Sequence, residues 1–174
     1  MTQGWMELEA ALFAAGEPLT VLALAQALGR DAAWVAEALG AYQASLELEN
    51  RGFRLRCVAG GWELHSAPAA RSVVQGLCAQ RLPRGLTAAQ METLAVIAYH
   101  QPIDRATLDH IRGVHSERSL AQLLEEELVA VHDHGGPGRS PRYGTTEGFL
   151  RRFGLADIGS LPRLPDPEPQ DEEA

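Results

Sequence analysis

The residues whose types and spacing could bind a metal are three histidines in the second half of the chain. His132 and His134 lie two positions apart in a segment with strand-like alternation, so their side chains should share one face, with His115 as a third candidate ligand. Zinc needs three or four ligands with supporting hydrogen bonds. No cysteine lies near them in the sequence, and Asp133 should point to the opposite face. A solvent-exposed strand is therefore the preferred interpretation, and we expect no bound metal.

Catalytic chemistry has few candidate residues in this sequence. All 15 basic residues are Arg, which excludes a P-loop lysine, a Schiff-base lysine and a lysine general base. Cys57 and Cys78 form no CxxC pair, and each is better explained as a small core residue than as a nucleophile. The glycine-rich segment 135–138 lacks the strand–loop–helix context of a phosphate-binding loop. We therefore expect no catalytic residue and no cofactor, in a protein that is not an enzyme.

Amphipathic helices are the main elements of the first half of the chain. Helical spacing of apolar residues predicts a helix around residues 8–15, which ends at Gly16. A second helix should follow Thr20, a third should follow a cap at Asp31, and a further helix is expected around residues 69–78. The third helix should carry one apolar stripe, formed by Val35, Ala38, Leu39, Tyr42 and Leu46.

A β-hairpin is predicted between the third and fourth of these helices. Hydrophobic residues there recur with period 2, which indicates strands at residues 53–59 and 62–66. Gly60 and Gly61 fit a two-residue turn, in which both central residues need positive φ. This turn would pair Ala59 with Trp62, Cys57 with Leu64 and Leu55 with Ser66. The register places the apolar side chains of both strands on one face.

The same order of elements returns in the second half. Thr87 and Gln90 form a capping box at the start of a helix. The inward residues of this helix should be Met91, Leu94, Ala95 and Ala98. Residues 101–103 should be extended, because the residue before Pro102 avoids the helical conformation. The elements expected next are a helix capped by Asp104, a helix capped by Ser116, strands around 129–132 and 143–145, and a final helix near 147–153.

Three helices and a two-stranded wing, present twice, define tandem winged-helix domains in a mainly α protein with small β-hairpins (α+β). The first domain should span residues 1–81 and the second residues 82–160, a size that suits two small domains. Residues 161–174 are rich in Pro and acidic residues and should form a disordered tail. Apolar runs are too short to span a bilayer and no signal peptide is evident, so we expect a cytoplasmic protein without membrane contact.

The charge distribution argues against a DNA-reading role for the predicted third helices. Residues 31–49 contain no basic residue, and residues 116–128 contain only Arg118 beside four glutamates. The chain carries a net charge of -8, whereas a protein that neutralises several phosphates needs a cation for each. Arginines near the second wing could contact phosphate weakly: Arg139, Arg142, Arg151 and Arg152. A winged-helix transcriptional regulator that binds DNA is the alternative interpretation.

Residues 92–105, Glu-Thr-Leu-Ala-Val-Ile-Ala-Tyr-His-Gln-Pro-Ile-Asp-Arg, resemble the hallmark segment of the segregation and condensation protein B (ScpB) family. Further segments that resemble this family are Ile111–Val114, Pro137–Arg139, Tyr143–Thr146, Phe149–Leu150, Phe153–Leu155, Leu8–Leu19 and Arg51–Phe53. The similarity runs from about residue 6 to residue 163. One departure is His115-Ser116-Glu117, where the family often has Asp-Ser or Asn-Ser, and this puts the cap of the following helix in doubt.

The resemblance implies a non-enzymatic, kite-type accessory subunit of the bacterial condensin. Such a subunit acts in chromosome condensation and segregation with the SMC ATPase and with the kleisin, segregation and condensation protein A (ScpA). The family typically dimerises through the first winged-helix domain, and the kleisin's central segment wraps the dimer. The resemblance therefore implies a homodimer at the nucleoid, contact with the SMC ATPase through the kleisin, and only weak or indirect contact with DNA.

Two sets of residues are candidates for these contacts. The first domain is too small to bury three tryptophans well, so we expect a dimer interface at Trp5, Trp34 and Trp62. A face of the second domain is expected to dock a helical segment of the kleisin, with Arg112 as a charge anchor. This face comprises Tyr99, Gln101, Pro102, Arg112, Gly113 and Val114. The alternative is that the aromatic residues fill the cores and that Gly113 only allows a tight turn.

Overall fold

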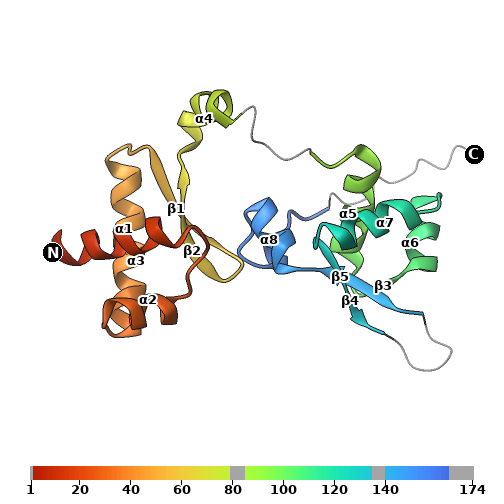
Figure 1. Ribbon diagram of the computed structural model, residues 1–174, viewed down its shortest axis with the longest axis horizontal. Coiled ribbons are helices and arrows are strands. Elements are labelled where there is room, and N and C mark those ends of the chain that lie inside the picture. The colour runs from red at the N-terminus through yellow and green to blue at the C-terminus, as the bar shows by residue number, and fades with distance from the viewer. Residues whose placement is uncertain (1, 79–84, 135–139, 165–174) are drawn as a thin grey trace, which may run out of the picture.

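The structure is a computed structural model that describes residues 2–78, 85–134 and 140–164. It forms two lobes, each with its own hydrophobic core and its own small antiparallel sheet (Figure 1). The fold is α+β, and both lobes have the winged-helix order of three helices followed by a wing. The fold class predicted from the sequence is confirmed.

The first lobe contains four helices and a two-stranded wing. The helices are α1 (Thr2–Ala15), α2 (Val21–Leu28), α3 (Ala32–Leu48) and α4 (Arg71–Cys78), the last preceded by a short 3-10 turn at Pro68–Ala70. The wing consists of β1 (Phe53–Val58) and β2 (Gly61–Ser66). Thr20 and Asp31 cap α2 and α3 as predicted, because their side chains accept hydrogen bonds from the amides of Ala23 and Ala33.

The core of the first lobe forms around the predicted stripe of α3. All five stripe residues are buried: Val35, Ala38, Leu39, Tyr42 and Leu46. They pack with Leu8 and Leu12 of α1, Leu24 of α2 and Leu55 of β1. The 3.6-residue period of the sequence was therefore sufficient to identify the face of α3 that is removed from water.

The turn of the first wing is shifted from the predicted position. Its two central residues are Ala59 and Gly60, with φ of 48° and 73°, and Val58 pairs with Gly61. The predicted pairs of Ala59 with Trp62, Cys57 with Leu64 and Leu55 with Ser66 are therefore wrong by two residues; the observed pairs are Cys57 with Trp62, Leu55 with Leu64 and Phe53 with Ser66. A shift of two residues preserves the face of every side chain, so Leu55 still points into the core.

A long-range contact explains why Gly61 is not a turn residue. Trp62 exchanges two backbone hydrogen bonds with Leu19, of 2.7 and 2.9 Å, which pulls the loop before α2 onto β2. A Cβ atom on Gly61 would lie 2.8 Å from the carbonyl carbon of Pro18. This glycine therefore allows a close backbone approach, which the sequence of the hairpin alone does not reveal.

The second lobe repeats the plan with one additional strand. Its helices are α5 (Ala88–His100), α6 (Arg105–Arg112), α7 (Glu117–Glu125) and α8 (Glu147–Phe153), followed by a 3-10 turn at Ile158–Ser160. Its strands are β3 (Ile103–Asp104), β4 (Val129–Asp133) and β5 (Arg142–Thr145). Because β5 lies between β4 and β3, the second wing is three-stranded rather than two-stranded as predicted.

Helix α5 has the predicted cap but not the predicted buried face. Thr87 and Gln90 form the capping box. Met91 and Ala95, predicted to point inward, are exposed, and the buried stripe is Gln90, Thr93, Leu94, Ile97 and Ala98. The Thr93 hydroxyl donates a hydrogen bond to the Ala89 carbonyl at 2.7 Å, so this polar side chain can be buried. The sequence pattern missed it because apolar residues alone were counted.

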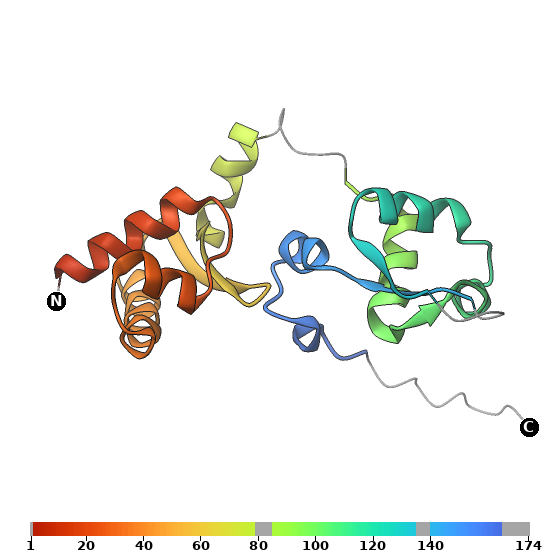
Figure 2. The same ribbon diagram turned by 60° about the horizontal axis from the view of Figure 1, so that its bottom comes forward.

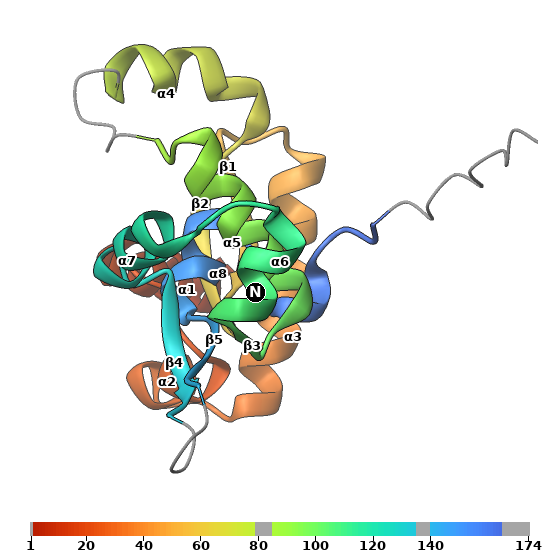
Figure 3. The same ribbon diagram turned by 90° about the vertical axis from the view of Figure 1, so that its right-hand side faces the viewer.

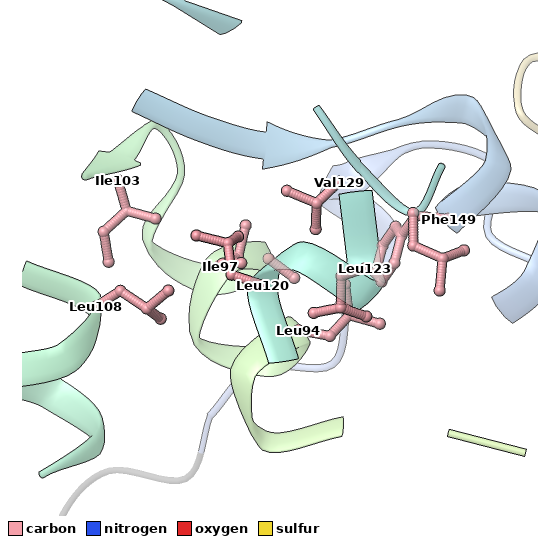
Figure 4. Close-up of a cluster of buried hydrophobic side chains, with 10 residues drawn as sticks. Leu94, Ile97, Ile103, Leu108, Leu120, Leu123, Val129 and Phe149 are labelled. Atoms are coloured by element: carbon pink, nitrogen blue, oxygen red, sulfur yellow. The ribbon is translucent and has the colours of Figure 1, made fainter. Parts of the chain in front are cut away.

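The core of the second lobe is contributed by every helix and by the sheet (Figure 4). Leu94 and Ile97 of α5 meet Leu120 and Leu123 of α7, and Phe149 of α8 closes one side. Completing the buried cluster are Ala98, Ile103, Leu108, Leu128 and Val129. This cluster shares no residue with the core of the first lobe.

The start of α7 differs from the prediction that Ser116 caps it. The Ser116 side chain makes no capping hydrogen bond. Instead, the Ser116 amide donates to Asp109 Oδ1 at 2.8 Å, and this bond holds the pKa of the Asp109 carboxyl below its usual value. His115 is 98% exposed and lies 3.5 Å from the other Asp109 oxygen. A carboxylate of α6 thus stabilises the turn in which the sequence departs from the family pattern.

A segment after α8, residues 155–162, is here called the strap. It lies next to the turn of the first wing (Figure 2), which donates hydrogen bonds from the Ala59 and Gly60 amides to the Leu155 and Ala156 carbonyls at 2.9 and 3.0 Å. Leu161 packs against the second core. Residues 161 and 162, predicted as the start of the tail, therefore contact the second lobe; residues 165–174 of the predicted tail lie outside the described residues.

Helix α4 stands apart from the first core (Figure 3). None of its residues is buried, and Val73 and Leu77 are 64% and 77% exposed. In the part of the chain that the structure describes, no helix is both long and apolar enough to cross a membrane.

Candidate functional site

A groove on the second lobe is lined by two of the predicted docking residues, Gln101 and Pro102. Its volume is about 600 Å³, and it is bounded by the α5–β3 junction, the wing, the start of α8 and the strap. The lining residues are Gln101, Pro102, His132, Asp133, Arg142, Thr145, Thr146, Glu147, Leu150, Asp157 and Ile158. A cavity of this size accommodates several side chains.

Gln101 fixes the floor of the groove. Its Oε1 accepts hydrogen bonds from the Thr145 amide at 2.6 Å and from the Thr145 hydroxyl at 3.0 Å. Gly144 leaves room for both side chains: a Cβ atom there would lie 2.8 Å from Gln101 Oε1 and 2.9 Å from the His132 ring, so a larger residue would displace them. The Gln101 side chain therefore joins α5 to β5 and is not free to bind a partner through Oε1.

A bulge in β4 brings two titratable side chains into the groove. The pairing with β5 shifts between Val131 and Asp133, so the alternation of faces is interrupted at His132. His132 and Asp133 both line the groove, and the prediction that Asp133 points to the opposite face is wrong. His132 Nε2 lies 3.2 Å from the Thr145 carbonyl oxygen.

The walls of the groove combine apolar surface with charges of both signs. Pro102, Leu150 and Ile158 supply apolar area, and Ile158 is 40% exposed. Glu147 forms an ion pair with Arg151, which lies outside the lining, at 3.2 Å. None of the lining residues is a Ser, Cys or Lys nucleophile. The arrangement is suited to holding a peptide segment by its apolar side chains rather than to breaking a bond.

Tyr99 lies beside this groove and holds the strap. Its hydroxyl donates a hydrogen bond to the Pro162 carbonyl at 2.7 Å, and the residue is 36% exposed. The predicted docking residues Tyr99, Gln101 and Pro102 therefore belong to one region. Two of them make hydrogen bonds within the second lobe: Tyr99 binds the strap and Gln101 binds Thr145.

Arg112, predicted as a charge anchor for the kleisin, has a buried side chain that contacts α5. Its side chain is 7% exposed, and its guanidinium donates to the Thr93 hydroxyl at 2.7 Å and to Glu92 Oε2 at 2.5 Å. Both acceptors lie on α5, six and seven residues before Tyr99, which corresponds to about 10 Å of helix. The structure assigns Arg112 to the attachment of α6 to α5.

Gly113 and Val114, which come after Arg112 in the chain, are not among the residues that line the groove. Gly113 ends α6 in the left-handed conformation with φ of 66°, as its role in a tight turn requires. Val114 is 54% exposed, and neighbouring Ile111 is 44% exposed. The six predicted docking residues are thus divided between two places, and the groove contains only Gln101 and Pro102.

The three tryptophans of the first lobe are partly buried against their own core. Trp5 lies 6.0 Å from Tyr42 between ring centroids, and the Arg30 guanidinium lies 5.2 Å from the Trp34 ring centroid. Trp5, Trp34 and Trp62 all pack on the core of the first lobe. Their role in a dimer interface stays a prediction, and this packing accounts for part of their apolar area.

Other apolar side chains of the first lobe are far more exposed. The most exposed are Leu48 at 87%, Phe13 and Leu77 at 77%, Leu22 at 73% and Met6 at 65%. Sequence reasoning missed them because it selected residues by size rather than by their place on each helix. The high polarity of the opposite face of α4 was the available signal for Leu77.

The histidines and cysteines do not assemble into a reactive centre among the described residues. No group of three or more His, Cys, Asp and Glu side chains in those residues has a geometry that could hold a metal ion. Cys57 and Cys78 are both half-buried thiols.

Arginines near the second wing are largely engaged with acidic residues. Arg151 pairs with Glu147, and Arg152 pairs with Glu126 of the α7 end at 2.8 Å. Arg142 lies opposite Asp104 in the sheet. The pKa of Asp104 is lowered mainly by the hydrogen bond from the Thr107 amide, and the charge of Arg142 lowers it further. Arg139 lies outside the described residues.

A sequence profile of a known family covers nearly the whole described chain. The family is described as "Segregation and condensation complex subunit ScpB", and the match spans residues 6–164. The chain belongs to the ScpB family. The resemblance inferred from the sequence is confirmed, and the family description makes the chain a subunit of the segregation and condensation complex.

Curated relatives in the ScpB family agree over most of the length. Segregation and condensation protein B of Symbiobacterium thermophilum is 43% identical over 162 residues, which cover 91% of this chain and 73% of that protein. The protein of the same name from Moorella thermoacetica is 41% identical over 160 residues, which cover 91% of this chain and 82% of that protein.

Solved structures of ScpB proteins are also similar to the chain. The crystal structure of ScpB from Mycobacterium tuberculosis is 32% identical and covers 88% of this chain and 96% of its own, with a TM-score of 0.43. A crystal structure described as a dimer of ScpB N-terminal domain complexed with ScpA peptide is 25% identical and covers 40% of this chain and 88% of its own, with a TM-score of 0.38.

Proposed function

We propose that this ScpB-family chain is a non-enzymatic accessory subunit of the bacterial condensin. It binds the kleisin ScpA through the groove of its second lobe and acts with the SMC ATPase through that kleisin. The observation that carries the proposal is the groove of about 600 Å³, which combines apolar walls with charges of both signs. Its place in a family of complex subunits supports a protein segment as the occupant.

The proposed occupant is a short kleisin segment with apolar side chains flanked by charged ones. Pro102, Leu150 and Ile158 offer apolar contact, while Arg142 and Asp157 offer opposite charges. Apolar area combined with polar and charged groups is typical of a protein interface. The exposed residues Ile111 and Val114 at the end of α6 form the competing location, which retains part of the docking face expected from the sequence.

Two isoleucines of similar exposure distinguish these locations. Ile158 lies on the groove wall at 40% exposure, and Ile111 lies on α6 outside the lining at 44% exposure. Purified ScpA is titrated calorimetrically into the wild type, I158E and I111E. We expect I158E to weaken binding by at least about tenfold, because a carboxylate would have to be buried at the interface, and I111E to bind like the wild type.

The same titration can contradict the proposal. Wild-type binding to ScpA that is lost in I111E and kept in I158E would move the site to the end of α6. No binding of ScpA to the wild type would refute the proposed function itself. Melting curves of both variants, recorded on the same samples, confirm that each is folded.

We also propose that the chain forms a homodimer through the first lobe, residues 1–80. The exposed side chains Val73 and Leu77 of α4, which have no core of their own, support this interface more strongly than the tryptophans do. Sedimentation equilibrium is expected to give a dimer mass for the wild type and a monomer mass for L77E. If the wild type and L77E are both dimers and W34A is a monomer, the dimer interface lies at the tryptophans instead of at α4.

The protein is further proposed to act in the cytoplasm at the nucleoid, with only weak or indirect DNA contact. The acidic third helix of the first lobe and the ion-paired arginines of the second support this part. Tight duplex binding by the isolated chain, with a steep loss as salt rises, would instead favour the transcriptional regulator.

A further inference from the structure

The strap is held at its first end by the other lobe. The amides of Ala59 and Gly60, at the turn of the first wing, donate to the carbonyls of Leu155 and Ala156 at 2.9 and 3.0 Å. Val58, which precedes this turn, is completely buried although it belongs to neither hydrophobic core. The wing tip, which in winged-helix proteins is commonly a free loop, is here engaged by the chain's own second lobe (Figure 2).

The strap is held at its second end by α5. The Tyr99 hydroxyl donates to the Pro162 carbonyl at 2.7 Å, and Leu155 and Leu161 pack against the second core. The second end is therefore fixed by the Tyr99 side chain and by core packing. The first end is held by both lobes, because the Leu155 amide also donates to the Leu150 carbonyl at 2.9 Å.

The middle of the strap forms one wall of the groove. Asp157 and Ile158 line it, and Asp157 Oδ1 accepts hydrogen bonds from the Ser160 amide at 2.9 Å and from the Ser160 hydroxyl at 3.0 Å. This local cap makes residues 157–160 a compact turn, so the wall moves as a unit when either end of the strap moves.

We infer that the strap couples the arrangement of the two lobes to the groove: docking of the first wing's turn on Leu155 and Ala156 holds Asp157 and Ile158 in the position that receives a kleisin segment. The inference rests on the proposed function only for the identity of that segment. Coupling is reciprocal, so a segment bound in the groove strengthens the contact between the lobes. Tyr99 is a positioning residue in this arrangement.

The contact between lobes is tested by cross-linking in the full chain. In a C57A/C78A background, A59C/A156C places one cysteine on each side of the two hydrogen bonds that join Ala59 to Leu155 and Gly60 to Ala156. A disulfide between them requires Cα atoms roughly 4.4–6.8 Å apart. The matched control A59C/A106C uses an exposed alanine of α6, far from the turn (Figure 1). We expect oxidation to form the first disulfide at least about tenfold faster than the control; equal rates would overturn the inference.

The coupling to the groove is tested by amide hydrogen exchange, without any partner. Exchange of the Ser160 amide should be at least about threefold slower in oxidised A59C/A156C than in the same reduced protein. Y99F should speed exchange of the Ala59 and Gly60 amides by about 2- to 10-fold, which is the factor that corresponds to the net free energy of one lost hydrogen bond. Y143F is the control, because the described residues provide no hydrogen bond to the Tyr143 hydroxyl.

Each result separates this inference from the proposed function. Unchanged Ser160 exchange after oxidation, or Y99F that behaves like Y143F, would overturn the coupling even if ScpA binds. If both effects are found and ScpA does not bind the wild type, the strap holds the groove wall and the kleisin is the wrong occupant. If ScpA binds and slows exchange at Ala59 and Gly60, both are supported.

Discussion

The two lobes share one plan, but their wings serve different purposes. The first wing has two strands, and its turn is bound to the strap through two backbone hydrogen bonds. The second wing gains β3 as a third strand and, through its bulge at His132, lines the groove. A winged-helix frame therefore determines where the core lies, while strand number and irregularities of the wing determine which surface remains open to a partner.

The helices of the two lobes differ in length, in the number of buried positions and in how much apolar surface they expose. Helix α3 has 17 residues and five buried positions, whereas the equivalent α7 has 9 residues and two. The first lobe leaves large apolar side chains such as Phe13 and Leu77 more than 70% exposed on its helices. The second lobe attaches its shorter helices through polar contacts, above all Arg112. The first lobe thus offers apolar helix faces for self-association, and the second offers a preformed groove.

The largest effect is expected from Arg112 of the second lobe. R112A removes a buried side chain and the charged hydrogen bond that it donates to the buried Thr93 hydroxyl, while its other partner, Glu92, is exposed. The lost packing and hydrogen bond should lower the free energy of unfolding by about 3 kcal/mol. Differential scanning calorimetry should show this shift in the second-lobe transition alone. R118A, at an exposed position of α7, should change little. An equally small effect of R112A would contradict the interior role of this side chain.

A smaller effect is expected from Trp5 of the first lobe. W5A removes a half-buried ring packed on Tyr42 and should destabilise the first lobe by about 2 kcal/mol, less than a fully buried tryptophan would cost. Urea unfolding followed by tryptophan fluorescence measures it, with L77E as a control that should leave monomer stability nearly unchanged. Full stability of W5A would indicate that this ring contributes to an intermolecular contact.

Helix caps should contribute about equally in both lobes. D31A removes the cap of α3, and D104A removes the cap of α6, and each should cost about 1 kcal/mol. Chemical denaturation of the two variants compares them directly. A much larger loss in D104A would mean that its place opposite Arg142 in the sheet matters more than the cap.

The response to strongly alkaline and strongly acidic pH should differ between the lobes. Burial raises the pKa of Tyr42 to about 12 from 10.0, so its contribution to the first lobe is complete below pH 10 and is lost as pH rises to about 12. Hydrogen bonds lower the pKa of Asp104 and Asp109 from 3.8, so their contribution to the second lobe is lost as pH falls below that value.

Near-ultraviolet circular dichroism across both ranges follows the two losses. Y42F should remove the alkaline step of the first lobe, and D109N should reduce the acid step of the second. Acid unfolding that begins in the first lobe would reverse this assignment.

Local signals in the sequence predicted most of the fold. The caps at Thr20, Asp31 and Thr87 depend on residues within three positions, and the buried stripe of α3 depends only on helical spacing. Each of these features is determined by neighbouring residues, so no tertiary information is needed to infer it. The order of helices and wings followed directly from them.

Features that depend on distant segments were not predictable in the same way. The position of the first turn depends on the approach of Pro18 to Gly61, and the burial of Arg112 depends on Thr93. The groove wall depends on Asp157 and Ile158 of the strap, for which the sequence predicted neither a helix nor a strand. Gln101 and Pro102 line the groove, whereas the residues at the end of α6 that were grouped with them lie outside its lining.

The most direct test of the central claim, that the groove of the second lobe receives ScpA, is a hydrogen-exchange footprint of the full chain with and without ScpA. We expect slower exchange in β5, at the start of α8 and at residues 157–160, and unchanged exchange at residues 110–114 of the α6 end. Protection confined to residues 110–114, with none at the groove, would contradict the account.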